Sequence, residues 1–399
     1  MSDNISKKLA SKYASLAFFT SLFLFFTPFE QGGSNPTMFP KYFVAGMSII
    51  LLVPLIAFQK IKLRAPSMLA LVALLTIIFH TIAVKPVPAQ FMLLIAANLV
   101  LAVVLYETSF SWSKEFESAV CWLLTLHAAI ITVQALLFYI FAHGIFDFHK
   151  LIFGSDSRFA EDFLNIARFS GMQVEPGTYA NYIGCLLGIL LLSSAFNEKI
   201  LWMSFLFVIS IFLTNSGSSF YFVPVLIALL AYLWRKKIRL SHVLILCIAI
   251  FAYMHFSGVV THLEDRFLQR DDGSLSHRME GVHAYMSTTL EEKFFGIGFG
   301  DDPCVRCYYQ DIGVTFNLLT RGGIIVTLAF GLLWLRSIAV NGLVLSVILF
   351  LIPLNEKMFF YEAPIWLFIL FAATGSKQLR AAKMPRDAPA RPQLAKAAL

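Results

Sequence analysis

The stretch Arg168-Phe-Ser-Gly-Met-Gln-Val-Glu-Pro-Gly-Thr-Tyr-Ala-Asn-Tyr182 leads from a polar loop directly into an apolar run that continues to about residue 196. Such a boundary is typical of a chain entering a membrane as a helix, so Arg168, Gln173 and Glu175 are expected at or just inside one membrane surface. Ionisable groups are costly to desolvate there and are candidates for function. The alternative is structural: an arginine that extends to water and a glutamate favoured by the helix dipole.

The composition indicates a membrane protein with many transmembrane segments. The 399 residues are 58% hydrophobic and 14% charged and include 40 phenylalanines, which excludes an ordinary soluble protein. Apolar runs recur that are long enough to cross a hydrocarbon core of about 30 Å. They are too long and too uniformly apolar for barrel strands, so the sequence predicts an all-α fold with about twelve transmembrane helices. These lie near residues 14–33, 41–58, 67–85, 90–107, 118–142, 176–196, 200–214, 218–234, 239–256, 315–335, 338–354 and 358–375.

The positions of the basic residues predict the topology. Lysine and arginine concentrate before the first span, after the second, between the eighth and ninth, and in the tail after Ser376. This bias marks the cytoplasmic side, so both termini are expected in the cytoplasm and the loops 143–175 and 257–315 in the periplasm. Residues 1–375 then form one transmembrane domain, and 376–399 a disordered basic cytoplasmic tail. The net charge of +7 is therefore a topology signal, and no nucleic-acid partner is expected.

The second long loop is expected to be partly helical. Ser276 is a good N-cap for a helix from about His277 to Thr288. On that helix Arg278, Val282 and Tyr285 share the apolar face, which would pack toward the membrane domain and direct the Arg278 guanidinium at a central cavity.

Three short motifs have plain structural interpretations. The glycine-rich run 296–300 is not placed between a strand and a helix, so it predicts a tight turn and not a nucleotide loop. The polar run 214–219 could touch a ligand, although a tight turn between helices is favoured. Cys304 and Cys307 lack two further ligands at standard spacing, so a disulfide or two free thiols are expected and no metal site. Polar residues inside the first five spans are expected to form hydrogen bonds between helices: His80, Asn98, His127 and Gln134.

The chain resembles the O-antigen ligase and polymerase superfamily of bacterial inner-membrane glycan-assembly enzymes. The resemblance rests on the order, spacing and common outer location of several short motifs. These are Arg168-Phe-Ser-Gly171, Glu175-Pro176, Ser276-His-Arg278, the stretch Phe294 to Gly300, and Asp311 followed by Asn317 and Gly322-Gly-Ile-Ile325. A His that ligases of this superfamily look to carry before the tenth span is absent, and Asp311 is nearest to its place, which favours a polymerase. An Arg that relatives often carry after Ser in the 214–219 run is also absent.

The resemblance implies an enzyme that polymerises undecaprenyl-diphosphate-linked oligosaccharide units at the periplasmic face, with no cofactor. The implied partners are the lipid-linked donor and acceptor, membrane lipid, and a chain-length regulator or other glycan-assembly proteins. The catalytic candidates are Arg168, Glu175, Arg278 and Asp311, and the substrate-binding candidates are Arg158, Gln173, Arg266, His277 and Arg321. Arginine would stabilise the diphosphate leaving group, and a carboxylate would take the proton of the attacking hydroxyl.

Other functions are kept as alternatives. A ligase would move finished glycan to a lipid or protein acceptor. A polysaccharide or lipid flippase would be expected to show paired broken helices in two related halves, and the sequence shows no such repeat. A purely structural partner in a glycan-synthesis complex is the fourth possibility.

Overall fold

The computed structural model describes residues 2–26, 39–57, 63–84, 89–141, 146–154, 156–157, 167–257, 280–283, 285–299, 313–354, 362–375 and 379. Within these ranges the regular structure is helical and includes no strand, so the predicted all-α membrane fold is confirmed. The helices are α1 (Ser2–Phe26), α2 (Phe39–Ala57), α3 (Ala65–Val84), α4 (Ala89–Ser111), α5 (Ser113–Tyr139), α6 (Phe148–Phe153), α7 (Pro176–Ser193), α8 (Glu198–Phe212), α9 (Gly217–Trp234), α10 (Leu240–Ser257), α13 (Leu290–Phe295), α14 (Gly313–Asn341), α15 (Leu343–Leu351) and α16 (Ala363–Ala372).

Each predicted transmembrane segment overlaps one of these helices, but the helices differ in length. In the described part of the chain, seven stretches are long and apolar enough to cross a membrane. They are Lys8–Phe26, Ala65–Ala83, Met92–Ser111, Ser113–Tyr139, Pro176–Ser193, Gly217–Trp234 and Gly313–Asn341. Over their described lengths α15 and α16 rise only about 14–15 Å, half of a hydrocarbon core of about 30 Å. The number of twelve spans therefore stays a prediction.

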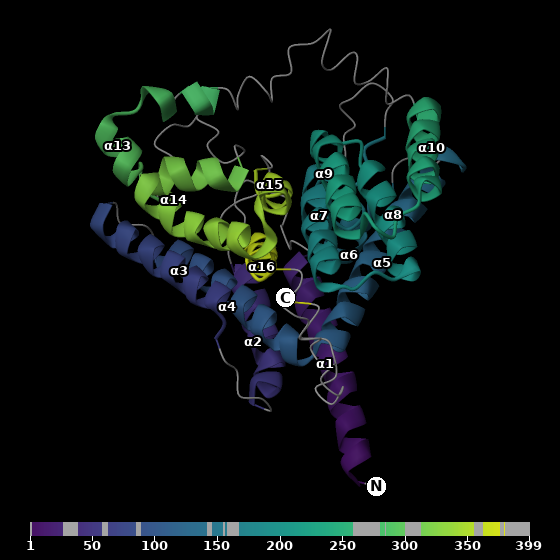
Figure 1. Ribbon diagram of the computed structural model, residues 1–399, viewed down its shortest axis with the longest axis horizontal. Coiled ribbons are helices and arrows are strands. Elements are labelled where there is room, and N and C mark those ends of the chain that lie inside the picture. The colour runs from purple at the N-terminus through teal and green to yellow at the C-terminus, as the bar shows by residue number, and fades with distance from the viewer. Residues whose placement is uncertain are drawn as a thin grey trace, which may run out of the picture.

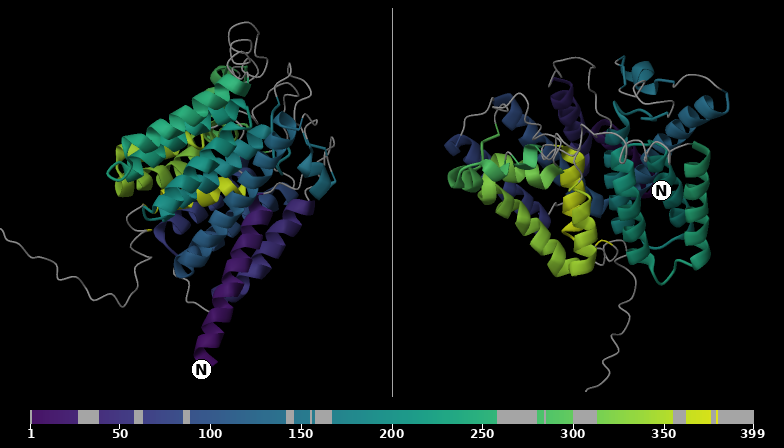
Figure 2. Two further views of the ribbon diagram at one scale, coloured as in Figure 1. Left: turned by 90° about the vertical axis from the view of Figure 1, so that its right-hand side faces the viewer. Right: turned by 90° about the horizontal axis from the view of Figure 1, so that it is seen from above.

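Helix α7 lies at the centre of one group of helices and packs against α5, α8, α9 and α16 (Figures 1 and 2). Of its residues 94% are buried, a larger share than in any other of the seven candidate spans. Two glycines permit this close packing, because a Cβ at Gly184 would lie 2.5 Å from the Phe222 ring and one at Gly188 would lie 2.7 Å from the Phe368 ring. The segment that enters α7 is thereby joined to a rigid core.

A second group of helices is built around α14, which packs against α3, α13 and α15. The sequence predicts one continuous helix over 315–335, and this is wrong in one respect. The helix is broken at Gly323, where φ is 62° and ψ is −167°, and its two arms diverge from that point (Figure 1). The second arm continues to Asn341, where Gly342 with a φ of 80° ends it, so the predicted boundary near 335–338 lies several residues too early.

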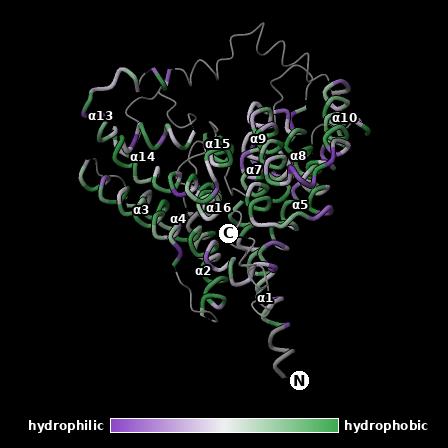
Figure 3. Tube along the Cα trace, viewed as in Figure 1, coloured by the Kyte–Doolittle hydropathy of each residue, from purple (hydrophilic) through white to green (hydrophobic). Residues whose placement is uncertain are grey.

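The outward surface of the bundle is apolar, as contact with lipid requires. Figure 3 shows hydrophobic residues along the outer helices of both groups. On α3 the side chains of Leu75, Phe79 and Ile82 are exposed, and on α10 those of Ile248 and Phe251 are exposed. Such residues would be an aggregation hazard in water but face a matching solvent in a bilayer.

An ion pair between the buried Glu107 and the partly exposed Arg64 joins the start of α3 to the end of α4. Glu107 is buried, and its carboxylate accepts hydrogen bonds from the Arg64 backbone N–H at 2.7 Å, from the Arg64 guanidinium, and from the Ser67 hydroxyl at 2.5 Å. The Arg64 guanidinium also lies 3.5 Å from the centre of the Phe110 ring. The charge of Glu107 is therefore compensated from several directions.

The second long loop is partly helical, as predicted. Within the predicted 277–288 helix, residues 280–283 and 285–287 are helical, and α13 follows. Val282 and Tyr285 are less exposed than Glu280 and His283, in agreement with an apolar face turned toward the protein. Burial raises the pKa of the Tyr285 hydroxyl, which indicates the same orientation. Arg278 itself lies outside the described residues.

Candidate active site

Arg168 stands on a loop segment whose neighbours on both sides are anchored. The Ala167 carbonyl accepts a hydrogen bond from Asn215 Nδ2 at 2.8 Å. Phe169 is fully buried, and its ring packs at 5.8 Å and 5.7 Å from the rings of Phe138 and Tyr139 on α5. Arg168 itself is half-buried. A partly buried arginine with a fixed backbone on each side is a preorganised positive charge at the edge of the bundle.

Asn215 belongs to the 214–219 turn between α8 and α9, which the structure confirms as a tight turn. Its φ of 49° lies in the left-handed region, which asparagine tolerates better than most residues. Asn215 Oδ1 accepts from the Tyr253 hydroxyl of α10 at 3.0 Å, and Tyr139 forms hydrogen bonds with both of these side chains. Ser216 caps α9 by accepting from the Ser219 backbone N–H at 3.1 Å. Asn215 therefore connects the Arg168 segment to α5 and α10, and Ser216 connects the same turn to the start of α9.

The residues after Arg168 are held by other contacts. The Gly171 backbone N–H donates to Gln134 Oε1 at 3.0 Å, and Gln134 Nε2 donates to the Phe146 carbonyl at 2.6 Å. Gln173 is fully buried, and its Nε2 donates to the Phe26 carbonyl at the end of α1 at 2.7 Å. Its amide thus joins the loop to α1, a structural task that the sequence did not indicate.

Glu175 lies where the loop becomes α7. It occupies the N-cap position with φ −143° and ψ 156°, and Pro176 takes the first helical position. The Glu175 side chain forms no hydrogen bond that caps α7. The residue is half-buried at the N-terminal end of α7. A carboxylate seven positions from Arg168, on the same anchored segment, is suitably placed for acid–base chemistry.

Arg321 lies in the second group of helices, two residues before the break in α14. It is buried, with 7% of its surface exposed. The Gly298 backbone N–H donates to the Arg321 carbonyl at 2.9 Å, and the Ile297 N–H donates to the Thr320 carbonyl at 2.9 Å. A Cβ at Gly296 would lie 2.2 Å from the Arg321 carbonyl oxygen. In the described residues 296–299, the glycines therefore allow backbone to lie directly on backbone, as a tight turn against α14.

Polar residues of the first spans also reach other segments. His80 on α3 forms a hydrogen bond with the Phe295 carbonyl, and its ring lies 5.5 Å from that of Phe299. Gln134 contacts Gly171, as described above. The predicted hydrogen bonding between helices is confirmed for His80, whereas Gln134 bonds loop residues instead of another helix. His127 differs: it is fully buried beside the Tyr179 ring, and neither ring nitrogen has a hydrogen-bond partner among the described residues.

The structure thus places four of the nine candidate residues. Arg168, Gln173 and Glu175 share one anchored segment, whereas Arg321 lies on α14, which packs with α3, α13 and α15. The others lie outside the described residues: Arg158, Arg266, His277, Arg278 and Asp311, as do Cys304 and Cys307. Among the residues that are described, no group of three or more His, Cys, Asp or Glu side chains could hold a metal ion.

Sequence reasoning missed Asn215, which holds the Ala167 carbonyl, and Tyr253, whose hydroxyl donates to Asn215 Oδ1. An asparagine between two apolar helices was the available signal for a left-handed turn position. Nothing in the sequence marks Tyr253, because one tyrosine near the end of an apolar helix is an ordinary interfacial residue.

Residues 202–316 match the family model described as O-Antigen ligase. The match covers less than a third of the chain and supports a relationship to the O-antigen ligase and polymerase superfamily. Members of that family are membrane glycosyltransferase-like enzymes that act on lipid-linked glycans. A search of curated proteins found no match. The matched segment contains both Asn215 and Tyr253, and Arg168 and Glu175 precede it.

Proposed function

We propose that this protein is a membrane glycosyltransferase that polymerises undecaprenyl-diphosphate-linked oligosaccharide units at the periplasmic face of the inner membrane. One observation carries the proposal. The hydrogen bond from Asn215 to the Ala167 carbonyl fixes Arg168 against the segment that matches the O-antigen ligase family. A lipid-linked diphosphate needs a positive charge beside it as it leaves. Arg168, held next to the segment that matches the family, would supply this charge.

In the proposed reaction a hydroxyl oxygen of the acceptor sugar attacks the anomeric carbon of the donor sugar. The bond between that carbon and the phosphate oxygen breaks, and the diphosphate leaves with the bonding electron pair. Glu175 or Asp311 takes the hydroxyl proton. Arg168 and Arg278 contact the departing diphosphate, since the guanidinium offers two parallel N–H donors to phosphate oxygens.

The remaining candidates have binding roles in this proposal. Arg321 would contribute positive charge near the outer end of the tenth predicted span, and Arg158, Arg266 and His277 would bind phosphate or sugar from the two long loops. Gln173 would support the segment that carries Arg168, which is consistent with its burial and its bond to Phe26.

The test is polymer formation by purified protein in lipid nanodiscs supplied with a lipid-linked oligosaccharide. Arg168→Lys keeps the charge but loses the fork geometry, so the rate should fall by about 100- to 1000-fold. Arg239→Lys, an exposed arginine after α9, is the matched control and should retain the wild-type rate. A near-normal rate for Arg168→Lys would exclude the diphosphate role of Arg168.

A double variant tests whether Arg168 and Arg278 serve one diphosphate. If they do, Arg168→Lys combined with Arg278→Lys should cost less than the product of the two single losses. Strict multiplication of the losses would show that the two arginines act on separate groups.

The ligase is the second candidate, because the matched family model carries that description. The glycan-length distribution in a deletion strain separates the two functions. Single repeat units on the carrier lipid indicate a lost polymerase, whereas long chains left on the carrier indicate a lost ligase. A flippase would instead move lipid-linked sugar from one leaflet of a vesicle membrane to the other, with no acceptor sugar present.

A further inference from the structure

A cavity of about 760 Å³ lies where three links between helices meet. The link after α7 contributes Phe196, the end of α9 and the link after it contribute residues 232–237, and the end of α14 with the link to α15 contributes residues 340–342. Leu345 of α15 completes the lining. The predicted topology places all three links on the cytoplasmic side, away from the Arg168 segment. We call this space the α9–α15 cavity.

The charged residues that line the α9–α15 cavity are all basic. They are Arg235, Lys236 and Lys237, and the lining includes no acidic residue. The ion pairs of the described residues lie elsewhere, at the start of α3 and beside α6, so these three cations have no carboxylate partner there. On the links that form the cavity, the acidic residue next in sequence is Glu198, and Lys199 follows it directly. The cavity therefore has an excess of positive charge.

The helix ends at the cavity change this charge only slightly. The ends of α9 and α14 each carry about half a negative charge, and the start of α15 carries about half a positive charge. Three whole positive charges exceed the remainder. Lysine and arginine side chains are also donors without an acceptor, and the Trp234 indole N–H, in a side chain only 2% exposed, has no hydrogen-bond partner among the described residues. The charge and the donors both favour an anion.

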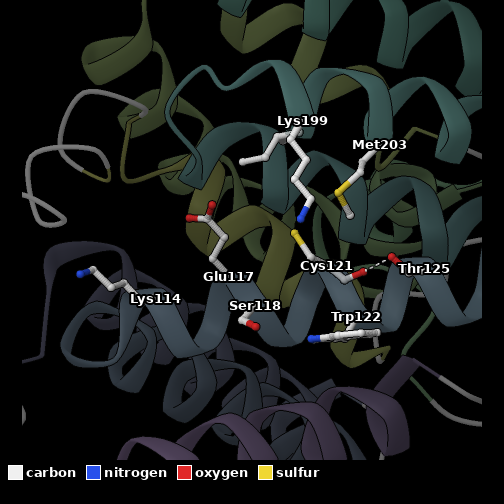
Figure 4. Close-up of a pocket in the computed structure, with 9 residues that line it drawn as sticks. Lys114, Glu117, Ser118, Cys121, Trp122, Thr125, Lys199 and Met203 are labelled. Atoms are coloured by element: carbon white, nitrogen blue, oxygen red, sulfur yellow. Dashed lines mark hydrogen bonds between the residues drawn. The ribbon is translucent and has the colours of Figure 1, made fainter.

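The cavity between α5 and α8 provides a contrast. It measures about 550 Å³ and lies on the same predicted side of the membrane. Figure 4 shows Glu117 between Lys114 and Lys199, and the Lys199 ammonium points toward Cys121. Charges of both signs line this cavity, so it does not select an anion. Its two lysines are therefore suitable control positions.

The α9–α15 cavity also adjoins the lipid-facing surface. Its remaining lining is largely apolar and includes Phe196, Leu233, Val340 and Leu345. On α15 the side chains of Leu343 and Val347 are 64% and 50% exposed, and they share one helix face because they are four positions apart. The Arg235 guanidinium lies 5.2 Å from the centre of the Tyr232 ring, which holds it beside the end of α9. An anion in this cavity can thus carry a hydrocarbon chain that lies along α15.

We propose that the α9–α15 cavity binds one anionic phospholipid of the cytoplasmic leaflet. The phosphate contacts Arg235, Lys236 and Lys237, and an acyl chain lies along Leu343 and Val347 of α15. Basic pockets between transmembrane helices on this side suit such headgroups. A free phosphate shares the charge but leaves the apolar lining unused, and a zwitterionic lipid brings its own cation beside the three basic residues. The proposal uses none of the residues assigned to glycan transfer, so it is independent of the proposed function.

The first experiment measures lipid retention by native mass spectrometry of the full-length protein with phosphatidylglycerol and with phosphatidylcholine. Each lysine near a lipid headgroup should contribute about fivefold to the affinity, so Lys236→Gln with Lys237→Gln should weaken phosphatidylglycerol binding by about 25-fold. Binding of phosphatidylcholine should not change. Lys236→Arg with Lys237→Arg keeps both charges and should keep phosphatidylglycerol bound.

The matched control is Lys114→Gln with Lys199→Gln, which removes the same charge on the same predicted side of the membrane. This variant should retain phosphatidylglycerol. An equal loss in both glutamine variants would show that only the total charge matters, and no loss in either would show that the cavity is not the site; each result would overturn the proposal.

A third arm separates the lipid from free phosphate. Inorganic phosphate should release phosphatidylglycerol no better than sodium chloride of equal ionic strength, since the acyl chain contributes contacts that phosphate lacks. Release by phosphate at lower ionic strength would indicate a free-phosphate site and refute the lipid as occupant.

A fourth measurement leaves every charge in place. Phosphatidylglycerol with brominated acyl chains quenches nearby tryptophan fluorescence, and Trp234 in the cavity lining should account for a saturable part of that quenching. Trp234→Phe should abolish this part, whereas Trp122→Phe, in the cavity between α5 and α8, should preserve it. Saturable quenching that survives Trp234→Phe would place the lipid elsewhere and contradict the assignment.

Discussion

Asn215→Gly is the sharpest test of how the Arg168 segment is held in place. Glycine adopts the φ of 49° at little cost, so the variant removes the side-chain hydrogen bonds of Asn215 and changes the turn itself very little. The bonds lost are those to the Ala167 carbonyl at 2.8 Å and from the Tyr253 hydroxyl at 3.0 Å, together with the contact to Tyr139.

The size of the effect follows from these contacts. A hydrogen bond contributes about 0.5–1.5 kcal/mol net, so two of them stabilise the anchored conformation by about 1–3 kcal/mol. Their loss shifts the equilibrium away from that conformation by about 5- to 150-fold. The transfer rate should fall by up to this factor, but not below the rate of Arg168→Lys, because Asn215 acts only by placing Arg168.

The assay is the nanodisc polymerisation rate, with the folded fraction of each variant checked by size exclusion and thermal unfolding. Tyr253→Phe removes one bond and leaves the Ala167 contact, so it should cost no more than about tenfold. Asn215→Gly combined with Arg168→Lys should be no slower than Arg168→Lys alone. Multiplied losses in the double variant would refute the idea that Asn215 acts through Arg168.

Three other predictions concern the fold and the topology. Glu107→Ala removes the buried acceptor of the Ser67 hydroxyl and of the Arg64 backbone N–H and should destabilise the protein by about 1–3 kcal/mol, visible as a lower midpoint of thermal unfolding; an unchanged midpoint would show that these hydrogen bonds contribute nothing. Gly323→Ala should reduce the yield of folded protein, because its Cβ would lie 2.2 Å from the Phe294 carbonyl oxygen, and wild-type yield would show that the broken helix is not needed. Cysteines introduced at Ser157 and Gly273 should react with an impermeant thiol reagent in intact cells with a permeable outer membrane, and labelling only after the inner membrane is opened would reverse the predicted topology.

The helices were predictable because lipid leaves the backbone few choices. An apolar run in a bilayer must satisfy its own hydrogen bonds, so its length and position fix a helix with little help from the rest of the chain. For α7 the predicted start agrees with the structure, because Pro176 and the polar residues before it mark the boundary. The break in α14 was not predictable from the same signal. Two adjacent glycines barely change hydropathy, and the break depends on residues 294–298, which lie far away in the sequence.

The candidate site also has a part that the sequence predicts and a part that it does not. Arg168 and Glu175 stood out because charge at the boundary of a span is costly and local. The anchoring by Asn215 was hidden, since a hydrogen bond to a backbone carbonyl 48 positions away requires no particular residue at the accepting end. The same reason explains why the bond from Gln173 to the Phe26 carbonyl was not predicted, whereas substrate binding by Gln173 stays a prediction. When a side chain binds a backbone atom, only the residue with the side chain can be recognised in the sequence, because every residue has a backbone carbonyl.

The candidate residues of the two groups of helices are held by different kinds of contact. Around Arg168, side chains of Asn215, Gln134 and Gln173 bind backbone atoms, so each contact can be removed singly and its effect measured. Around Arg321, backbone lies on backbone, and only glycine at 296 and 323 leaves the room this requires. A side-chain change near Arg168 should therefore alter the rate in graded steps, whereas a change of either glycine displaces the whole α13–α14 contact at once. This difference makes the Arg168 segment the place where the chemistry can be dissected without loss of the fold.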